Sequence, residues 1–301
     1  MQDVVRVYVG TDRSQLLAVA VLEHSIRRHT RRQVQVCPLI DLDLPEPKDV
    51  RQGSRTNFSF ARFAIPELAG YAGKALYLDA DMLVFRDIGE LWDIPFDGYS
   101  VAIQEGVPDH AVSHQKAGAP DKRVKQCSVM LIDCARARWD VHEIVGGLDG
   151  RYTYEQLMYE LCILPEEDIR YAVPFAWNSL EHHDSGTRLI HYTDMDTQPW
   201  VSTENRNGGL WMEEVRLMLD TGALTPAELE TEINLGYFRP SLAHELQEMP
   251  HRRGWNAAAA ARYAAIDHQA GFVRHAEVYR RKRLRAEAIK RYEAARRASA
   301  A

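Results

Sequence analysis

The order of the first predicted elements limits the fold of this chain more than any other feature of its sequence. Alternating apolar residues predict a strand at residues 4–9, helically spaced ones predict a helix at 16–29, and a second strand is expected at 34–40. The turn Gly10-Thr11-Asp12 ends the first strand. Because a strand, a helix and a strand in this order form a β-α-β unit, we expect an α/β fold with a doubly wound, Rossmann-like mixed sheet flanked by helices.

The rest of the chain divides into a longer body and a helical end. Short apolar runs predict strands at 75–78, 100–103, 129–132 and 189–192, and helices at 58–68, 88–92 and about 155–161. From about residue 224 the pattern is helical, with Pro226 in a helix-start signal and an Ala-rich stretch at 257–265. We therefore place the main domain at residues 1–250 and a helical appendage at residues 251–301.

The composition indicates a globular, cytoplasmic protein. The chain has 301 residues, 46% of them hydrophobic, which suffices for a large core and argues against a disordered chain or a small disulfide scaffold. No apolar run approaches the roughly 20 residues that cross a bilayer, and the first residues enter a strand pattern instead of a leader. Four cysteines without Cys-x-x-Cys spacing are expected to be reduced core residues: Cys37, Cys127, Cys134 and Cys162.

Charge is distributed unevenly along the chain. Residues 271–301 carry ten Lys or Arg and three Glu, a net charge of +7, which leaves −13 for the remaining residues. An acidic body argues against nucleic-acid binding, because phosphate recognition needs a basic surface. The basic end is expected to be helical, with an incomplete apolar stripe formed by Tyr279, Leu284, Ala288, Ile289 and Tyr292. Two alternatives stay open: a solvated helix that packs on the acidic body, or peripheral contact with an anionic cytoplasmic membrane face.

Two carboxylates follow the predicted strand at 75–78. Asp79 and Asp81 are one residue apart between apolar runs, and in an extended segment such residues project to the same side. Both can therefore approach one hard divalent cation through oxygen ligands. Such a cation can bridge the phosphates of a nucleotide-sugar and stabilise the charge of the leaving nucleoside diphosphate. The alternative is a pair of turn or helix-capping aspartates.

The surrounding block resembles the signature of glycosyltransferase family 8, the retaining transferases that include glycogenin and bacterial lipopolysaccharide galactosyl- and glucosyltransferases. Residues 61–68, 74–84 and 88–92 carry this resemblance, which extends over about residues 4–200. Residues 7–12 are similar to the family's first strand and nucleotide-binding turn. The family's His…Lys-Pro-Trp motif is similar to residues 189–192 with 198–200. The resemblance implies a GT-A fold and metal-dependent, retaining transfer of a glucose- or galactose-type hexose from a UDP-sugar to a saccharide or glycolipid acceptor.

The resemblance also implies roles for individual residues. The implied ligands of Mn²⁺ or Mg²⁺, which also hold the donor diphosphate, are Asp79, Asp81 and His191. The implied contacts to the rest of the donor are Gly10, Thr11, Asp12, Arg62, Ala80 and Gln198. Gln156 matches the Gln of the family's Asp-Gln-Asp motif, which lies beside the reacting sugar carbon, and Glu155 stands for that motif's first Asp. Arg62 and Gln156 are therefore the expected catalytic residues.

Three positions depart from the family pattern. The usual Lys before Pro-Trp is Gln198, which carries no positive charge for the diphosphate. Gln126-Cys127-Ser128 replaces the Asn-small-Gly triplet, and Gln15 replaces an aromatic residue in the first turn. We therefore expect Arg62, the metal or a second arginine such as Arg188 or Arg206 to stabilise the leaving group, and these departures leave the identity of the sugar open.

Other interpretations of the same residues stay open. An inverting GT-A transferase would need a carboxylate base, for which Glu166, Glu167 and Asp168 are candidates. A non-catalytic sugar-binding protein fits the departures, and a haloacid-dehalogenase-type phosphatase also places Asp-x-Asp after a strand. The pair His182-His183 suggests a metal or an acceptor-facing loop. The aromatic residues Trp177 and Trp200 are candidates for an acceptor pocket or for the core.

Overall fold

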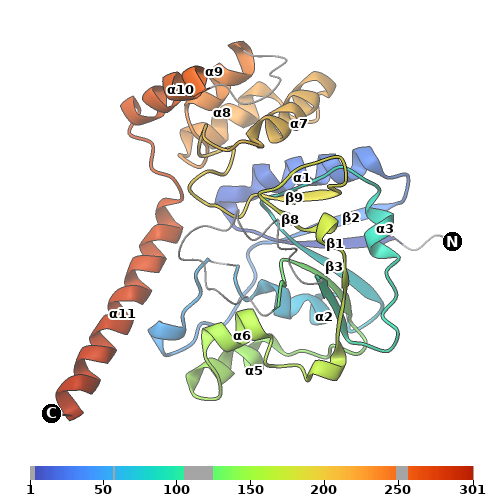
Figure 1. Ribbon diagram of the computed structural model, residues 1–301, viewed down its shortest axis with the longest axis vertical. Helices are drawn as coiled ribbons and strands as arrows, with labels where there is room; N and C mark the ends of the chain where they lie inside the picture. Colours follow the sequence, from blue (N-terminus) through green and yellow to red (C-terminus); the bar gives the residue numbers. More distant parts are fainter. Residues whose placement is uncertain (1–3, 57, 105–124, 249–256, 301) are drawn as a thin grey trace.

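The computed structural model describes residues 4–56, 58–104, 125–248 and 257–300, and its centre is a six-stranded mixed sheet (Figure 1). The strands, in sheet order, are β2 (Val34–Leu39), β1 (Val5–Gly10), β3 (Lys74–Asp79), β6 (Val129–Asp133), β5 (Val101–Gln104) and β7 (Ile169–Val173). Among the described strands of this sheet, only β6 runs antiparallel to both of its neighbours, β3 and β5. The other described strand pairs of this sheet are parallel, which confirms the expected mixed sheet.

A second, smaller sheet continues from the end of β3. It consists of β4 (Met82–Val84), β9 (Leu189–His191) and β8 (Ser179–Leu180), in that order. The antiparallel pairing of β4 with β9 places Met82 opposite His191. This register brings residues more than a hundred positions apart to one end of the central sheet.

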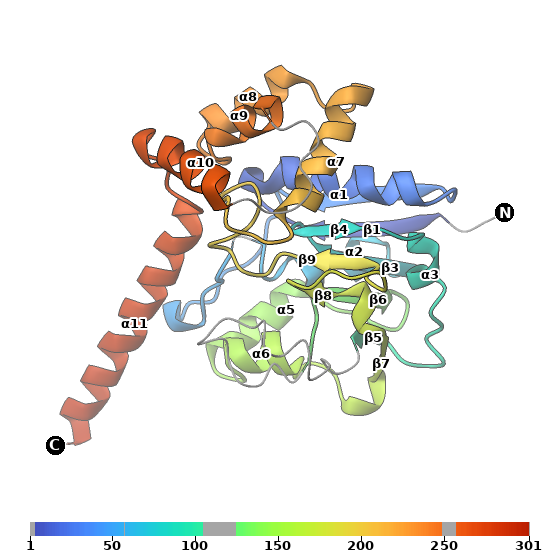
Figure 2. The same cartoon turned by 45° about the horizontal axis from the view of Figure 1, so that its top comes forward.

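Helices cover both faces of the sheet (Figures 1 and 2). On one face α1 (Leu16–His29) packs with a layer formed by α7 (Gly208–Thr221), α8 (Pro226–Asn234), α9 (Ser241–Glu248) and α10 (Ala257–Gln269). On the other face lie α2 (Ile65–Leu68), α5 (Val141–Gly146) and α6 (Tyr154–Glu160). The short α3 (Ile88–Trp92) flanks the sheet. The 25-residue α11 (Ala276–Ala300) runs past the 3₁₀ turn Val50–Gln52, where Arg51 lies over the Tyr292 ring at 3.4 Å, and its last turns project beyond the body.

The apolar pattern of α1 explains its place between two layers. Val19, Leu22 and Ile26 belong to the cluster that covers the sheet, whereas Leu17 and Val21 belong to the cluster with α7 and α9. Helical spacing of 3.6 residues per turn puts these two sets on different sides of one helix. The expected bounds of this helix are therefore confirmed, because both of its faces are specified by burial.

The predicted helix at 58–68 is only partly present. Residues Ala61–Ala64 form a 3₁₀ turn, and α-helix begins at Ile65. Pro66 has no backbone N–H to donate to the carbonyl of Arg62, so a continuous α-helix would lose a hydrogen bond there. The helical region near the C-terminus begins at Gly208, earlier than expected at 224, because Trp211 and Val215 bury an apolar face despite the two glycines that open α7.

The boundary expected near residue 250 lies at residues 249–256, outside the described part of the chain. On either side of it α9 and α10 are joined, since Asp267 accepts hydrogen bonds from the Ser241 backbone N–H and hydroxyl at 2.7 and 2.8 Å. No helix within the described ranges is long and apolar enough to span a membrane. All four cysteines are free, as expected, but Cys162 is exposed and is therefore not a core residue.

Candidate functional site

Three candidate metal ligands meet at the carboxyl end of β3. Asp79 is the last residue of β3, Asp81 precedes β4, and His191 is the last residue of β9. One ligand atom from each lies within 4.8 Å of the others. His191 Nε2 is 3.0 Å from Asp81 Oδ1 and 3.8 Å from Asp79 Oδ2. The three residues implied by the family resemblance are thus together, at the strand ends where α/β sheets bind ligands.

The second ring nitrogen of His191 fixes the orientation of the imidazole. Nδ1 lies 2.9 Å from Asn178 Oδ1, while the Asn178 amide group donates to Ser128 Oγ at 2.9 Å and to Gln104. Because this assigns Asn178 Oδ1 as an acceptor, Nδ1 carries a proton, and in the neutral form of the ring the Nε2 lone pair faces Asp81. A histidine oriented by a polar partner in this way is typical of metal sites.

The cluster therefore contains two acceptor atoms that face each other. Asp81 Oδ1 is buried and receives no hydrogen bond from any described residue. A buried carboxylate oxygen without a donor costs free energy unless a cation compensates it. A divalent metal ion fits this position, since two carboxylates and a neutral imidazole are ligands that such ions accept.

Asp79 is held by a residue that sequence inspection did not single out. The fully buried Tyr77 donates from its hydroxyl to Asp79 Oδ1 at 2.5 Å. Burial raises the pKa of Tyr77 well above its ordinary value, so the phenol remains a donor. Gly10 lies opposite Asp79 in the β1–β3 register, and a Cβ there would come within 2.3 Å of the Tyr77 hydroxyl. Glycine at this position thus leaves the space that the Tyr77 hydroxyl occupies.

Arg62 lies beside the same carboxylate. Its Nη2 is 3.6 Å from Asp79 Oδ1, its Nη1 donates to the Cys127 carbonyl at 2.6 Å, and its guanidinium lies 4.4 Å from the centre of the Tyr77 ring. Arg62 Nε is buried without a partner among the described residues. Burial raises the pKa of Asp79, and the positive charge of Arg62 opposes this effect. Arg62 is therefore a buried cation at the cluster.

Gln198 also lies at the cluster, at the end of the loop that follows His191. Its amide group donates to Asp81 Oδ2 at 2.7 Å and to the Tyr192 carbonyl at 2.9 Å. Glu181 supports this loop by accepting a hydrogen bond from the Asp194 backbone N–H at 2.8 Å. The side chain of Gln198 is thus directed at a candidate metal ligand.

The turn after β1 borders the cluster. Gly10 is next to Asp79 in the sheet, and Thr11 is buried. Asp12 caps a 3₁₀ turn (Arg13–Gln15) by accepting from the Ser14 backbone N–H at 2.9 Å. Its carboxylate is therefore already bound locally. Ala80, between the two aspartates, is buried as well.

Gln156 is engaged elsewhere. It is exposed on α6, and its side-chain oxygen accepts from the Thr153 backbone N–H at 2.9 Å in a capping box. The neighbouring Glu155 is paired with Arg285 of α11 at 2.8 Å and with Arg55 at 3.4 Å. Burial alone would raise the pKa of Glu155, but the hydrogen bond from Arg285 and the charge of Arg55 lower it. No described contact joins Gln156 to the metal ligands.

The residues considered for other interpretations lie apart from the cluster. Glu166, Glu167 and Asp168 precede β7, which is parallel to β5 and β3, so they enter the sheet at the edge opposite to Asp79. His182 is bound to Asp184 at 3.0 Å. Trp177 and Trp200 are fully buried and belong to the core. Asn178, which the sequence suggested with Trp177 only for an acceptor pocket, instead orients His191, a role that was missed.

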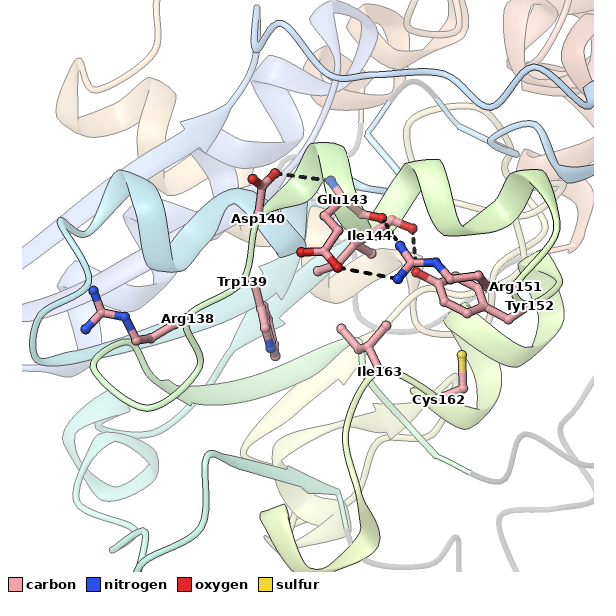
Figure 3. Close-up of a pocket in the computed structure, with 9 residues that line it drawn as sticks. All are labelled: Arg138, Trp139, Asp140, Glu143, Ile144, Arg151, Tyr152, Cys162 and Ile163. Carbon is pink, nitrogen blue, oxygen red and sulfur yellow. Dashed lines mark hydrogen bonds and ion pairs between the residues drawn. The ribbon is translucent and has the colours of Figure 1, made fainter.

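A separate depression of about 340 Å³ lies beside α5 (Figure 3). Arg151 crosses it toward Glu143, at 3.4 Å, and Trp139, Tyr152 and Ile163 line it. None of its lining residues belongs to the cluster of Asp79, Asp81 and His191. The depression is therefore not part of the candidate metal site.

Comparisons with known proteins agree with this site. Residues 7–129 match the model of "Glycosyl transferase family 8". The chain is 30% identical to Protein CDI of Arabidopsis thaliana over 217 residues, which cover 69% of the chain and 80% of that relative. The structure is similar to galactosyltransferase LgtC, with a TM-score of 0.50 and 16% identity over 75% of this chain and 99% of that one. It is also similar to the bifunctional glycosyltransferase WbbM, with a TM-score of 0.53 and 17% identity over 76% of this chain. The match spans about half (51%) of the length of WbbM. These likenesses confirm the expected GT-A fold.

Proposed function

Because the chain belongs to glycosyltransferase family 8, we propose that it transfers a hexose of glucose or galactose type from a UDP-sugar to a saccharide or glycolipid acceptor, with retention at the anomeric carbon. The observation that carries this proposal is the cluster of Asp79, Asp81 and His191, in which a buried carboxylate oxygen has no hydrogen-bond donor in the part of the chain that the structure describes. A site of this kind takes up a divalent cation, for which we propose Mn²⁺ or Mg²⁺.

We assign the residues around the cluster to different parts of the bound donor. Asp79, Asp81 and His191 hold the cation, which when bound neutralises charge on the donor diphosphate. Arg62 has a buried N–H without a partner among the described residues and is directed at the same place, so we assign it to the diphosphate. We assign the turn Gly10-Thr11-Asp12 to the nucleobase, and Ala80 and Gln198 to the donor, because they border the ligands.

The proposed reaction exchanges one bond at the sugar for another. The bond between the anomeric carbon and the phosphate oxygen breaks, a bond to the acceptor oxygen forms on the same face, and the acceptor proton passes to the departing phosphate. The leaving phosphate serves as the base, since Asp79 and Asp81 are assigned to the metal. Gln156 is proposed to lie beside the reacting carbon, which requires its side chain to leave the capping hydrogen bond with Thr153.

The test is a panel of nucleotide-sugars incubated with and without Mn²⁺, followed by detection of free sugar and nucleoside diphosphate. We expect metal-dependent hydrolysis of a UDP-hexose, abolished by EDTA, with retained anomeric configuration in the NMR spectrum of the first product. Inverted product would favour the inverting class. Release of phosphate from a phosphomonoester, without cleavage of any nucleotide-sugar, would favour the phosphatase. Binding without turnover would indicate a sugar-binding protein.

We also propose that the protein is cytoplasmic and contacts an anionic membrane face through the outer half of α11. Arg291 and Arg297 pair only weakly with acidic residues of their own helix, at 3.5 Å, and their side chains are 82% and 83% exposed. Basic residues near an anionic bilayer contribute about 1 kcal/mol each. Such contact would bring the site to a lipid-linked acceptor.

Vesicle sedimentation tests the membrane proposal. Replacing Lys290, Arg291, Arg296 and Arg297 with Gln should abolish binding to phosphatidylserine vesicles at low salt. A matched control replaces four exposed arginines of the body with Gln: Arg86, Arg136, Arg138 and Arg151. Binding to neutral vesicles is not expected, and high salt should release the wild type. Equal partitioning of the two variants would contradict the proposal and leave α11 as a solvated helix.

A further inference from the structure

The connection between α10 and α11 is anchored on the loop that carries the candidate site. Arg274 donates to the Asp196 carbonyl at 2.6 Å, and the Tyr279 hydroxyl donates to the Asp196 carboxylate. Asp196 lies between His191 and Gln198 in the chain, so both contacts fix this connection next to two cluster residues. Figures 1 and 2 show α11 starting at the edge of the sheet that lies opposite the N-terminus, where β1 ends.

His275 occupies the centre of this connection. Its Nε2 is buried and has no hydrogen-bond partner among the described residues. Its φ of 42° lies in the left-handed region, a costly conformation that the flanking contacts of Arg274 and Tyr279 maintain. The carboxylates whose charges act most on its ring are Asp81, at the cluster, and Asp12, at the end of β1. Negative charges from two parts of the proposed donor site, the metal cluster and the turn after β1, therefore act on the imidazole.

The first half of α11 is also paired with two other segments of the body. Arg281 pairs with Glu46 at 3.2 Å, and Arg285 pairs with Glu155 at 2.8 Å. Glu46 and Glu155 belong to segments far from the loop of Asp196 in the sequence. The helix is therefore held by several parts of the body, and the buried Nε2 of His275 lies in the connection that precedes it.

A bound diphosphate needs more donors than the cluster residues supply. The two aspartates balance the charge of one divalent cation, which leaves the diphosphate charge to side chains. Arg62 supplies one charge to the diphosphate but also binds the Cys127 carbonyl and lies beside Asp79. The Gln198 amide is neutral and bound to Asp81. Burial lowers the pKa of His275 to about 4, so its imidazole is neutral near pH 7 and can donate one ring N–H.

We propose that His275 is a donor-binding residue, and that its Nε2–H donates a hydrogen bond to a phosphate oxygen of the bound nucleoside diphosphate. The proposal rests on the proposed function, since it requires a nucleoside diphosphate at the cluster. The C-terminal segment would then bind the substrate directly. It would add a hydrogen-bond donor to a site in which position 198, before Pro199-Trp200, carries no positive charge.

Calorimetric titration separates this role from a structural one. We compare wild type, His275→Ala and His275→Gln for binding of Mn²⁺ alone and of UDP in saturating Mn²⁺. The Ala variant should bind UDP about tenfold more weakly, the loss expected for one hydrogen bond to a charged group, with unchanged Mn²⁺ affinity. Glutamine can place an amide N–H near the position of Nε2, so His275→Gln should recover most of the affinity. His268→Ala, an exposed histidine of α10, is the matched control and should bind like the wild type.

The other possible outcomes of this titration would each contradict a specific part of the proposal. Unchanged UDP affinity in His275→Ala would overturn the assignment of His275 alone, because the wild type would still bind. Equal loss in the Ala and Gln variants, or loss of Mn²⁺ affinity, would show that His275 only supports the structure. If UDP fails with the wild type, ADP, GDP and CDP are titrated in the same way. A wild type that binds no nucleoside diphosphate with Mn²⁺ would overturn the proposed function and, with it, this inference.

Discussion

The metal cluster and helix α11 are held in place by different forces. The side chains of Asp79, Asp81 and His191 are 19%, 16% and 4% exposed, and each is attached at or next to the end of a strand. The contacts of α11 with the body involve longer side chains: Arg281 is 31% exposed and its partner Glu46 is 53% exposed. Strand register thus fixes the first region. The second is positioned by ion pairs with partly exposed partners, together with the buried Val278 at the start of the helix.

This difference predicts how each region responds to change. Buried charges interact strongly and tolerate little rearrangement, so removal of one partner at the cluster should have a large effect. Exposed ion pairs contribute about 0–1 kcal/mol and weaken in salt. Substitutions at the cluster should therefore affect function or folding sharply, and substitutions along α11 should act gradually.

The largest effect is expected for Asp81→Asn. The amide keeps the size of the side chain but removes a charge from the proposed metal site, so turnover should fall by about 10²- to 10³-fold. The melting temperature without metal should change little, while stabilisation by Mn²⁺ should disappear. Asp133→Asn, at the end of β6, is the control and should keep both properties. Full, EDTA-sensitive turnover in the Asp81 variant would show that the cluster is not the metal site.

A second test concerns the space between β1 and β3. Gly10→Ala should destabilise the fold by about 1–3 kcal/mol, because the new Cβ would meet the Tyr77 hydroxyl. In a Tyr77→Phe background the same change should cost less, since the nearest remaining ring atoms are 3.0 Å away. Urea unfolding of the four proteins measures this coupling.

Gly146→Ala is the matched control for this cycle. Apart from its chain neighbours and the backbone of its own helix, no described residue of the chain lies within 4 Å of the added Cβ in α5, so we expect no loss of stability. If Gly10→Ala costs as little stability as Gly146→Ala, then β1 does not confine the Tyr77 hydroxyl. The statement that strand register fixes the cluster would then be wrong.

The sequence predicted the buried region better than the surface. The β-α-β opening and the pairing of Asp79 with Asp81 follow from hydrophobic period and spacing, because burial enforces both. The role of Asn178 was not predicted, since it depends on the approach of β8 and β9 across 13 residues. The capping hydrogen bond of Gln156 was also missed, although Thr153 three residues earlier is the signal of a capping box. Contacts of α11 with the body join residues more than 80 positions apart, and no periodic pattern in the sequence indicates them.

A smaller effect is expected at Gln198, which lies between the metal cluster and the loop that contacts the start of α11. Gln198→Lys should tighten UDP binding by about three- to tenfold in saturating Mn²⁺, because a charge-assisted hydrogen bond to the diphosphate replaces a neutral one. Gln269→Lys adds the same charge at the exposed end of α10 and should leave the affinity unchanged. Unchanged affinity in Gln198→Lys would place the side chain away from the diphosphate despite its contact with Asp81.

The smallest effect is expected where α11 meets the body. A double-mutant cycle of Glu46→Gln and Arg281→Gln isolates their pairing from the contact of Arg281 with Glu277 in its own helix. The coupling in the free energy of unfolding should be about 0.2–1 kcal/mol at low salt, the range of exposed ion pairs, and should vanish near 1 M salt, where the Debye length is about 3 Å. The intrahelical pair Arg297 and Glu293 provides a comparison on the same helix that does not involve the body. A coupling above about 2 kcal/mol that survives salt would mean that α11 is bound as rigidly as a buried element. In that case the contrast with the cluster would fail, and His275 would be held in the site by packing rather than by solvated charge.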